Sequence, residues 1–450
     1  MPATRAPGRV SPARACALRV IRRVFEQDAY ADRAFAGEAS DLEPRDRALA
    51  MALSYGTVQR RATLDHIATQ LLDRRLERLE APVLAVLRLG LFELLLLGGS
   101  ADHAAVNESV ELAKRASPRG AGLVNAVLRR ATREGPAILA GLGDETPEVA
   151  AVLHSVPGWL ATQWWEELGP EEARGLLCVV NRPAESALRV NTLAAAPAEV
   201  AGGLPVASRP APGVPEGLVL EGPFDIQSSE PWRAGTIQPQ SRASMLVARV
   251  LDPQPGQRVL DLCAAPGGKT THLAALIEDR GQIVAVERHP GRAAALQRTA
   301  ARLHAASVRV EVGDAAQARG DGPFDRVLVD PPCSGLGTLQ SRPDLRWRAR
   351  REAIGELTEL QGRILEAGAG CLAPGGALVY SVCTISRAEG QGVIERFLAA
   401  RDDFAAEEPA LSDELRGVPA GPGVQLLPHR DGTDGFFIAR LRRAGPRPRN

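Results

Sequence analysis

From residue 257 onward, short apolar runs alternate with amphipathic stretches, and this alternation constrains the fold more than any other feature of the chain. Strand-length runs separated by segments of helical periodicity are typical of parallel strands joined by right-handed crossovers. The pattern therefore predicts a doubly wound, mostly parallel α/β sheet, in which ligands bind at the carboxyl ends of the strands. The predicted strands are residues 258–262, 282–286, 308–312, 326–329 and 377–382.

A glycine-rich turn, residues 261–270, follows the first predicted strand and opens a helix. Two glycines there let the backbone approach a ligand closely. Glu287 ends the next strand about 20 residues later, where a carboxylate commonly binds ribose hydroxyls. Asp314 closes the third strand and can meet the adenine end of a nucleoside. An NTPase is excluded because its phosphate loop requires glycine where this chain has Cys263, and a hydride-transfer enzyme is disfavoured because G-x-G-x-x-G is absent.

Two cysteines follow the fourth and fifth predicted strands, Cys333 in Asp-Pro-Pro-Cys-Ser-Gly and Cys383 in Tyr-Ser-Val-Cys-Thr. If these strands are neighbours, they are about 5 Å apart and both thiols face one pocket. Carbon 5 of cytosine attacks a methyl sulfonium only after a nucleophile has added to carbon 6, and a thiolate of lowered pKa is well suited to that addition. Amino-group methyltransferases carry an aromatic residue at the position of Cys333. The pattern therefore favours covalent pyrimidine methylation.

Composition limits what else the chain can be. The six cysteines form no C-x-x-C pair and no His-Cys cluster at metal spacing, so we expect neither a metal site nor disulfides. The formal net charge is zero, and attraction for nucleic acid must come from local arginines. Lys114 and Lys269 are the only lysines, which suggests that Lys269 is needed as a compact ammonium. The start of the chain lacks a sustained apolar stretch, so we predict a cytoplasmic protein without a membrane segment.

The length of 450 residues suggests two or three domains. Residues 11–133 show helical periodicity throughout, residues 135–147 have the composition of a connection, and a second helical piece opens near Pro157. Beyond Ser186, short apolar runs among many prolines and glycines predict a small mixed domain. We predict an all-α domain at 1–140, a small α+β linker domain at 150–240 and the α/β domain at 241–445.

In these motifs the chain resembles the RNA 5-methylcytosine methyltransferases over nearly its whole length. Val382 and Thr384 depart from the family's usual T-C-S around the catalytic cysteine. The resemblance implies a Rossmann-like domain that uses S-adenosyl-L-methionine, with Cys383 as the nucleophile on carbon 6, Cys333 assisting breakdown of the adduct and Asp330 contacting the cytosine. The cofactor-binding residues carried over from the family are Cys263, Ala264, Ala265, Pro266, Gly267, Gly268, Lys269, Glu287, Asp314 and Asp330.

Motifs in the first domain, at residues 55–58, 103–108 and 122–129, look like the helical RNA-binding fold of the antitermination factor NusB. Residues 189–193 and 434–437 resemble the entry to the family's small RNA-binding domain and its closing strand. The resemblance implies unassembled 16S ribosomal RNA as the partner, and we expect a monomer. Three alternatives stay open: a 5-methylcytosine methyltransferase that acts on another RNA, a DNA cytosine methyltransferase whose nucleophile is Cys333, and a non-catalytic RNA-binding factor with a degenerate α/β domain.

Overall fold

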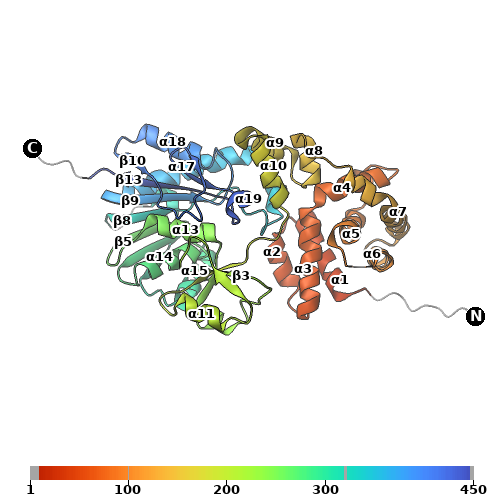
Figure 1. Cartoon of the computed structure of the whole chain (residues 1–450), viewed down its shortest axis with the longest axis horizontal. Coiled ribbons are helices and arrows are strands. Elements are labelled where there is room, and N and C mark those ends of the chain that lie inside the picture. Colours follow the sequence, from red (N-terminus) through yellow and green to blue (C-terminus); the bar gives the residue numbers. More distant parts are fainter. Residues whose placement is uncertain (1–9, 100, 319–321, 446–450) are drawn as a thin grey trace, which may run out of the picture. The chain divides into compact units, whose positions relative to one another are not determined.

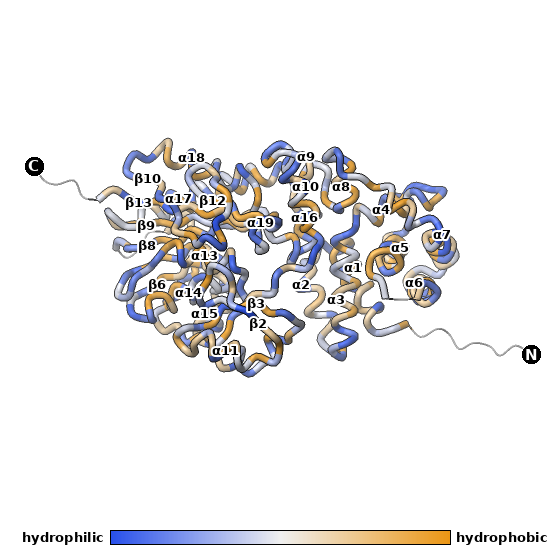
Figure 2. The backbone as a smooth tube through the Cα atoms, viewed as in Figure 1, coloured by the Kyte–Doolittle hydropathy of each residue, from blue (hydrophilic) through white to orange (hydrophobic). Residues whose placement is uncertain are grey.

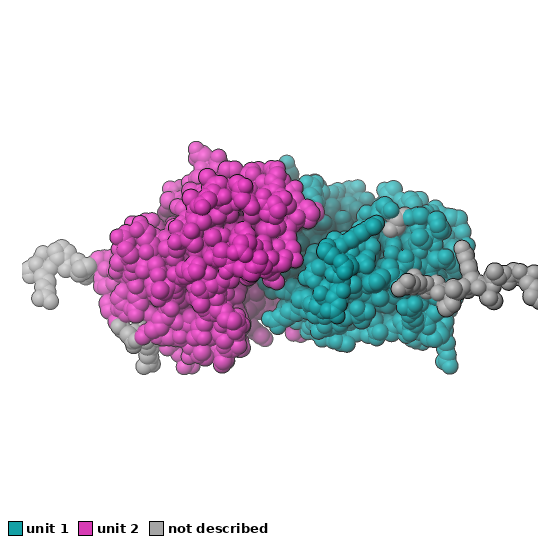
Figure 3. All heavy atoms as spheres, turned by 90° about the horizontal axis from the view of Figure 1, so that it is seen from below, with its two compact units in different colours: residues 1–182, 339–348 teal, residues 183–338, 349–450 magenta. Residues whose placement is uncertain are grey.

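The computed structural model describes residues 10–99, 101–318 and 322–445 (Figure 1). The chain divides into two compact units, unit 1 with residues 1–182 and 339–348 and unit 2 with residues 183–338 and 349–450 (Figure 3). Residues 1–9, where we predict no signal or membrane segment, lie outside the described residues. In the described part of the chain, no helix combines the length and the apolarity that a membrane crossing requires.

Unit 1 is built from helices, several of which begin at a proline in the first turn, where the missing N–H costs nothing. Its elements are α1 (Pro12–Glu26), α2 (Ala31–Glu38), α3 (Pro44–Gln59), α4 (Arg61–Leu71), η1 (Leu76–Arg78), α5 (Ala81–Phe92), η2 (Glu93–Leu97), α6 (Asp102–Ala116), η3 (Pro118–Gly120), α7 (Ala121–Ala140), α8 (Pro147–Leu153), α9 (Gly158–Leu168), α10 (Pro170–Val179) and α16 (Leu345–Arg348).

Helix α5 forms the centre of unit 1 and is apolar on nearly every side, as its orange trace in Figure 2 shows. It packs against α1, α3, α4, α6 and α7. Gly56 in α3 lies against the ring of Phe92, and a Cβ at this position would meet the ring at 1.9 Å. A helix buried on all faces needs neighbours this close, so the small residue at position 56 is required by packing. The predicted all-α domain is confirmed.

Helix α7 continues to Ala140, so the prediction that the connection begins at residue 135 is wrong. Pro136 lies inside the helix, where it removes one backbone hydrogen bond. Gly135 approaches Leu95 so closely that a Cβ would lie 2.8 Å from its side chain, and Ile138 and Leu139 pack against the unit 1 core. This apolar packing outweighs the local cost of the proline, which a composition rule alone overestimates.

Residues 339–348 belong to unit 1, although unit 2 flanks them on both sides. Arg346 in α16 is fully buried and donates to the Asn181 side chain at 2.7 Å and to several backbone carbonyls, among them those of Ser155 and Val180. Trp347 donates through Nε1 to the carbonyl of Val58 at 2.6 Å. These bonds hold a segment that begins four residues after the Cys-Ser-Gly motif.

Unit 2 begins with a small antiparallel sheet in the order β2-β3-β1-β4. Arg189 on β1 is fully buried, and its guanidinium donates to Gln240 and Thr271, which ties the strand to the rest of the unit. Short strands are therefore confirmed beyond residue 186, whereas the three-part division at 1–140, 150–240 and 241–445 stays a prediction. The elements are β1 (Ala187–Val190), α11 (Pro197–Gly203), β2 (Ser208–Pro210), β3 (Gly217–Leu220), α12 (Glu230–Arg233) and β4 (Ile237–Pro239).

A nine-stranded sheet, counted over the described residues, forms the rest of unit 2. It has the order β11-β12-β13-β9-β8-β5-β6-β7, and β10 pairs with β13. Its elements are α13 (Arg242–Leu251), β5 (Arg258–Leu262), α14 (Gly268–Leu276), β6 (Gln282–Glu287), α15 (Pro290–Arg302), β7 (Val308–Val312), η4 (Ala315–Gln317), β8 (Phe324–Val329), α17 (Arg351–Cys371), β9 (Leu372–Val382), α18 (Gln391–Ala400), β10 (Phe404–Glu407), β11 (Val418–Ala420), β12 (Gly423–Leu426), α19 (Pro428–Asp431) and β13 (Phe436–Arg443).

Helices cover both faces of the large sheet (Figure 1). Val259 on β5 packs with α13 and α14, whereas its neighbour Leu260 packs with α17 and α18. Successive side chains of a strand point to opposite faces, so two buried faces explain the continuous apolar runs. Strands β9, β8, β5, β6 and β7 are parallel, and the antiparallel strands lie at one side. The predicted doubly wound, mostly parallel sheet is confirmed.

Candidate active site

The glycine-rich turn leaves β5 with two residues in the left-handed region, Cys263 at φ +66° and Gly267 at φ +103°. A Cβ on Gly267 would also lie 2.4 Å from Leu296, so this position requires glycine. Thr270 in α14 donates through its hydroxyl to the buried carboxylate of Asp261 at 2.6 Å. The turn is thereby fixed to both the strand and the helix, and the first turn of α14 opens at the carboxyl edge of the sheet.

Glu287 and Asp314 lie beside this turn, at the ends of the next two strands. β5 pairs with β6 and β6 with β7, so the turn, Glu287 and Asp314 occupy three neighbouring positions along the edge. Adjacent strands lie about 4.8 Å apart, so the three positions span about 10 Å, the length of a nucleoside. The Glu287 carboxylate accepts from the backbone N–H of His289 at 2.9 Å, which fixes its orientation. A close-approach turn and two carboxylates in this order fit a nucleoside ligand.

Asp330 follows β8, which lies on the other side of β5 from β6. It connects the glycine-rich turn to the end of β9. Its carboxylate accepts from the Lys269 ammonium at 2.8 Å and from the Ser381 hydroxyl at 2.8 Å. Burial disfavours the charged amine, but the Asp330 carboxylate raises the pKa of Lys269 above its ordinary value. Lys269 therefore stays an ammonium at this edge and lies over the ring of Phe436 at 5.2 Å.

The two predicted cysteines meet at the same edge. β8 and β9 are adjacent and parallel, and the sulfur atoms of Cys333 and Cys383 lie 3.4 Å apart. The backbone N–H of Gly337 donates to the carbonyl of Cys383 at 3.1 Å, which connects the two loops. The structure therefore brings both thiols, Asp330 and Lys269 together. It places Cys371 at the end of α17, away from this group, with its sulfur directed to the carbonyl of Ala318.

The three cysteines of this edge differ in acidity. Burial, reinforced by nearby carboxylates, raises the pKa of Cys263 to about 12. The hydrogen bond between the two sulfurs raises the pKa of Cys333 well above its ordinary value and lowers that of Cys383. Burial and the Asp330 carboxylate oppose the lowering at Cys383, and the ammonium of Lys269 supports it. Cys383 is therefore the cysteine of the three whose thiolate is favoured, which is the form that attacks carbon.

Glu389 is a residue of the site that the sequence did not single out. Its fully buried carboxylate accepts from the backbone N–H of Ser334 at 2.8 Å and from the Ser334 hydroxyl at 2.6 Å. It also accepts from the hydroxyl of Thr384 at 3.3 Å and from the amide of Gln361 at 3.2 Å. Ser334 and Thr384 each follow one of the two cysteines, so one carboxylate fixes both loops. Its place six residues beyond Cys383 gives no local signal.

The fold and this edge define a class of protein: a Rossmann-like methyltransferase. Family comparisons agree, since residues 248–442 match the family described as 16S rRNA methyltransferase RsmB/F. Residues 11–133 match the NusB family, and residues 156–227 match the ferredoxin-like domain of RsmF/B-like methyltransferases. The chain belongs to the RsmB/F family of 16S rRNA methyltransferases, and its resemblance to NusB in the first domain is confirmed.

Relatives match over nearly the full length of the chain. The ribosomal RNA small subunit methyltransferase B of Thermus thermophilus is 38% identical over 403 residues, 89% of this chain and 89% of that protein. The protein of the same description from Xylella fastidiosa is 35% identical and covers 94% of this chain and 99% of its own length. Among solved structures, a methyltransferase homolog protein from Pyrococcus horikoshii is 28% identical with a TM-score of 0.58, covering 66% of this chain and 99% of that one.

Proposed function

We propose that this protein methylates carbon 5 of a cytosine in 16S ribosomal RNA, with S-adenosyl-L-methionine as the methyl donor and Cys383 as a covalent nucleophile. The observation that carries the proposal is the pair of sulfurs 3.4 Å apart, in which hydrogen bonding favours the thiolate at Cys383 and the thiol at Cys333. Paired thiols with opposite proton affinities suit a reaction in which one sulfur forms a bond to carbon and later leaves it.

The reaction begins when the Cys383 thiolate adds to carbon 6 of the cytosine, which places electron density on carbon 5. S-adenosyl-L-methionine, when bound, supplies an electrophilic methyl group on a sulfonium. Carbon 5 takes this methyl group, and the electrons of the broken bond stay with the sulfur of the donor. Loss of the carbon 5 proton to a base then restores the ring double bond and expels the Cys383 thiolate. The Cys333 thiol stabilises that departing thiolate by donating a hydrogen bond.

The residues at the carboxyl edge of the sheet form two groups, one that binds the methyl donor and one that binds the cytosine. The turn residues Cys263–Lys269, with Glu287 and Asp314, lie on the β5, β6 and β7 side and hold the nucleoside part of the donor. Asp330 and the two thiols lie on the β8 and β9 side and hold the cytosine. Lys269 bonds to Asp330 and so stands between the two groups. This order along one edge places a methyl donor next to a base held at Cys383.

The target base must leave its stack to reach a thiol at the edge of a buried sheet, so the substrate is single-stranded or loop RNA. We assign RNA binding to the NusB-like helices and to the small α+β domain. The proposed partner is unassembled small-subunit RNA, and the protein is proposed to act as a monomer in the cytoplasm. With a formal net charge of zero, local arginines must contact phosphates. Affinity should then fall steeply with salt, and a flat response would contradict an arginine-lined RNA surface.

The test is transfer of labelled methyl from S-adenosyl-L-methionine to unmodified small-subunit rRNA, followed by analysis of the modified nucleoside. The proposal expects label in 5-methylcytidine. Transfer to duplex DNA instead would favour the DNA methyltransferase alternative with Cys333 as nucleophile. A protein that binds RNA but neither binds S-adenosyl-L-methionine nor transfers methyl would be the non-catalytic factor.

A further inference from the structure

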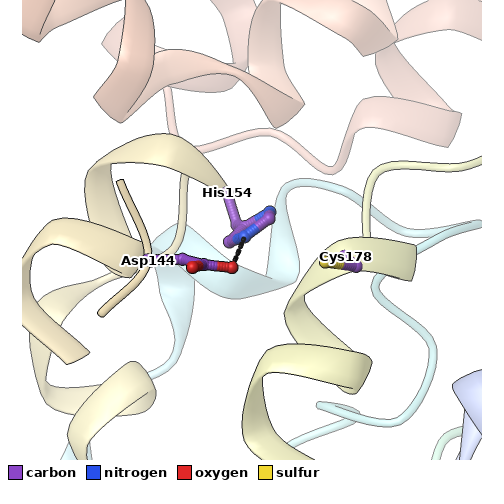
Figure 4. Close-up of side chains that lie close together, drawn as sticks. All are labelled: Asp144, His154 and Cys178. Atoms are coloured by element: carbon purple, nitrogen blue, oxygen red, sulfur yellow. Dashed lines mark ion pairs between the residues drawn. The ribbon is translucent and has the colours of Figure 1, made fainter. Parts of the chain in front are cut away.

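Three side chains with metal-binding atoms come together in unit 1, far along the sequence from the cysteines of the proposed active site (Figure 4). Asp144 lies between α7 and α8, His154 directly follows α8, and Cys178 lies on α10. One ligand atom from each lies within 4.8 Å of the other two. The three residues are far apart in the sequence and do not form a short Cys-His motif. The sequence analysis therefore predicts no metal site.

His154 is the most constrained member of the group. It is 91% buried, and its Nε2 atom has no hydrogen-bond partner among the described residues. This atom is directed to Asp144 Oδ2 at 3.9 Å, a distance too long for a hydrogen bond (Figure 4). A buried imidazole nitrogen without a partner is costly, and a ligand would remove that cost.

We propose that Asp144, His154 and Cys178 bind a divalent ion of the zinc class, with water in the fourth position. Thiolate, imidazole and carboxylate together are a donor set typical of zinc. The thiolate and the carboxylate carry two negative charges, which balance the two positive charges of a divalent ion. Tetrahedral ligands at zinc distances lie about 3.5 Å apart, so the site closes by ~1 Å when loaded. Asp144 and Cys178 are partly or fully exposed and can rotate to make that adjustment.

An ion at this place would reinforce three segments that already share two hydrogen bonds, from Arg174 on α10 to the carbonyl of Asp144 at 3.1 Å and from Asn181 to the carbonyl of His154 at 2.6 Å. It would bind the α7–α8 connection to the end of α8, and both to α10. Binding to the folded chain but not to the unfolded chain raises stability, so the ion should raise the melting temperature of the protein.

Cobalt(II) is the probe, because a thiolate ligand gives tetrahedral cobalt a charge-transfer band in the near ultraviolet. The metal-free full-length protein is titrated with cobalt(II) and then with zinc. We expect one equivalent to give the band, zinc to abolish it, and Cys178→Ser and His154→Gln each to lose it. The combined variant Cys333→Ser, Cys383→Ser serves as the matched control, because it removes the other close thiol pair and should keep the band.

Two results would overturn the site. A wild-type protein that shows no charge-transfer band with cobalt(II) does not bind metal through a cysteine. A band that survives in Cys178→Ser, or that disappears in the Cys333→Ser, Cys383→Ser control, comes from elsewhere in the chain. Because Cys178 is exposed, its serine variant should fold, and circular dichroism together with the melting temperature in the presence of a chelator verifies this.

Discussion

The sulfur atoms of Cys333 and Cys383 lie 3.4 Å apart, at the carboxyl ends of two adjacent parallel strands. A shared hydrogen bond makes them unequal, since it lowers the pKa of Cys383 and raises that of Cys333. The proposed reaction uses this inequality twice: the thiolate attacks the base, and the thiol assists when the same sulfur leaves. Each half can be tested separately.

Replacing Cys333 by alanine should trap the enzyme on its RNA. Without the Cys333 thiol, the departing Cys383 thiolate loses its hydrogen-bond donor, and breakdown of the adduct becomes slower than its formation. We expect a protein–RNA species that survives denaturing electrophoresis. The double variant Cys333→Ala, Cys383→Ala is the control and should form none. Rapid release of unbound RNA from Cys333→Ala would remove the proposed role of this cysteine.

Lys269 should set the pH at which the enzyme becomes active. The reactive form is the thiolate, so activity rises with pH through the pKa of Cys383, which lies below the ordinary value of 9.0. Lys269→Met removes a positive charge that favours the thiolate, and the rising limb of kcat/KM should move to higher pH. Lys114→Met, on the exposed side chain of the other lysine, should leave the profile unchanged. If the rising limb of kcat/KM stays at the same pH in Lys269→Met, Lys269 does not lower the pKa of Cys383.

Glu389 should act as a positioning residue. In Glu389→Gln an amide N–H would face donors that now bond to a carboxylate, so we expect unfolding free energy to fall by about 2 kcal/mol and kcat to fall more than KM rises. Thr384→Ser retains the hydroxyl that reaches Glu389 and should keep activity, whereas Thr384→Val should not. Equal activity of the two Thr384 variants would show that this hydrogen bond does not position the cysteine loop.

His272 should make stability depend on pH. It is 1% exposed, and burial lowers its pKa to about 4. Between pH 6.5 and about 4 the unfolded chain binds a proton at His272 that the folded chain does not, so His272 alone lowers the free energy of unfolding by about 1.4 kcal/mol for each unit of decreasing pH. Asp261 opposes this contribution, because burial raises its pKa to about 7. His272→Gln should flatten this slope in urea titrations, and His103→Gln, at an exposed position, should not. A slope unchanged in His272→Gln would place the pH dependence elsewhere.

The sequence predicts the central strands of the sheet well because they are buried on both faces, which gives continuous apolar runs with clear ends. The predicted run 258–262 coincides with the buried strand β5, and the run 308–312 coincides with β7, an edge strand that is only partly buried. Neighbouring parallel strands then bring their ends together, so the meeting of Cys333 and Cys383 could also be anticipated. The scarcity of lysine suggested a role for Lys269, and the structure places its ammonium at Asp330.

Contacts between segments far apart in the chain could not be predicted from the sequence. The helical course of residues 135–140 depends on packing against Leu95, which outweighs the composition of the segment itself. Glu389 bonds to two loops that precede it by different distances along the chain, and a lone glutamate carries no local pattern. The group of Asp144, His154 and Cys178 likewise exists only after three helices have packed.

The most direct test of the account compares wild type and Cys383→Ala for methyl transfer from labelled S-adenosyl-L-methionine to small-subunit rRNA, with the modified base mapped and cofactor binding measured in parallel. With wild type we expect label at carbon 5 of a single cytosine. With Cys383→Ala we expect at least about 1,000-fold less transfer and an unchanged cofactor affinity. Transfer by Cys383→Ala at the wild-type rate and position would contradict the assignment of Cys383 as the nucleophile.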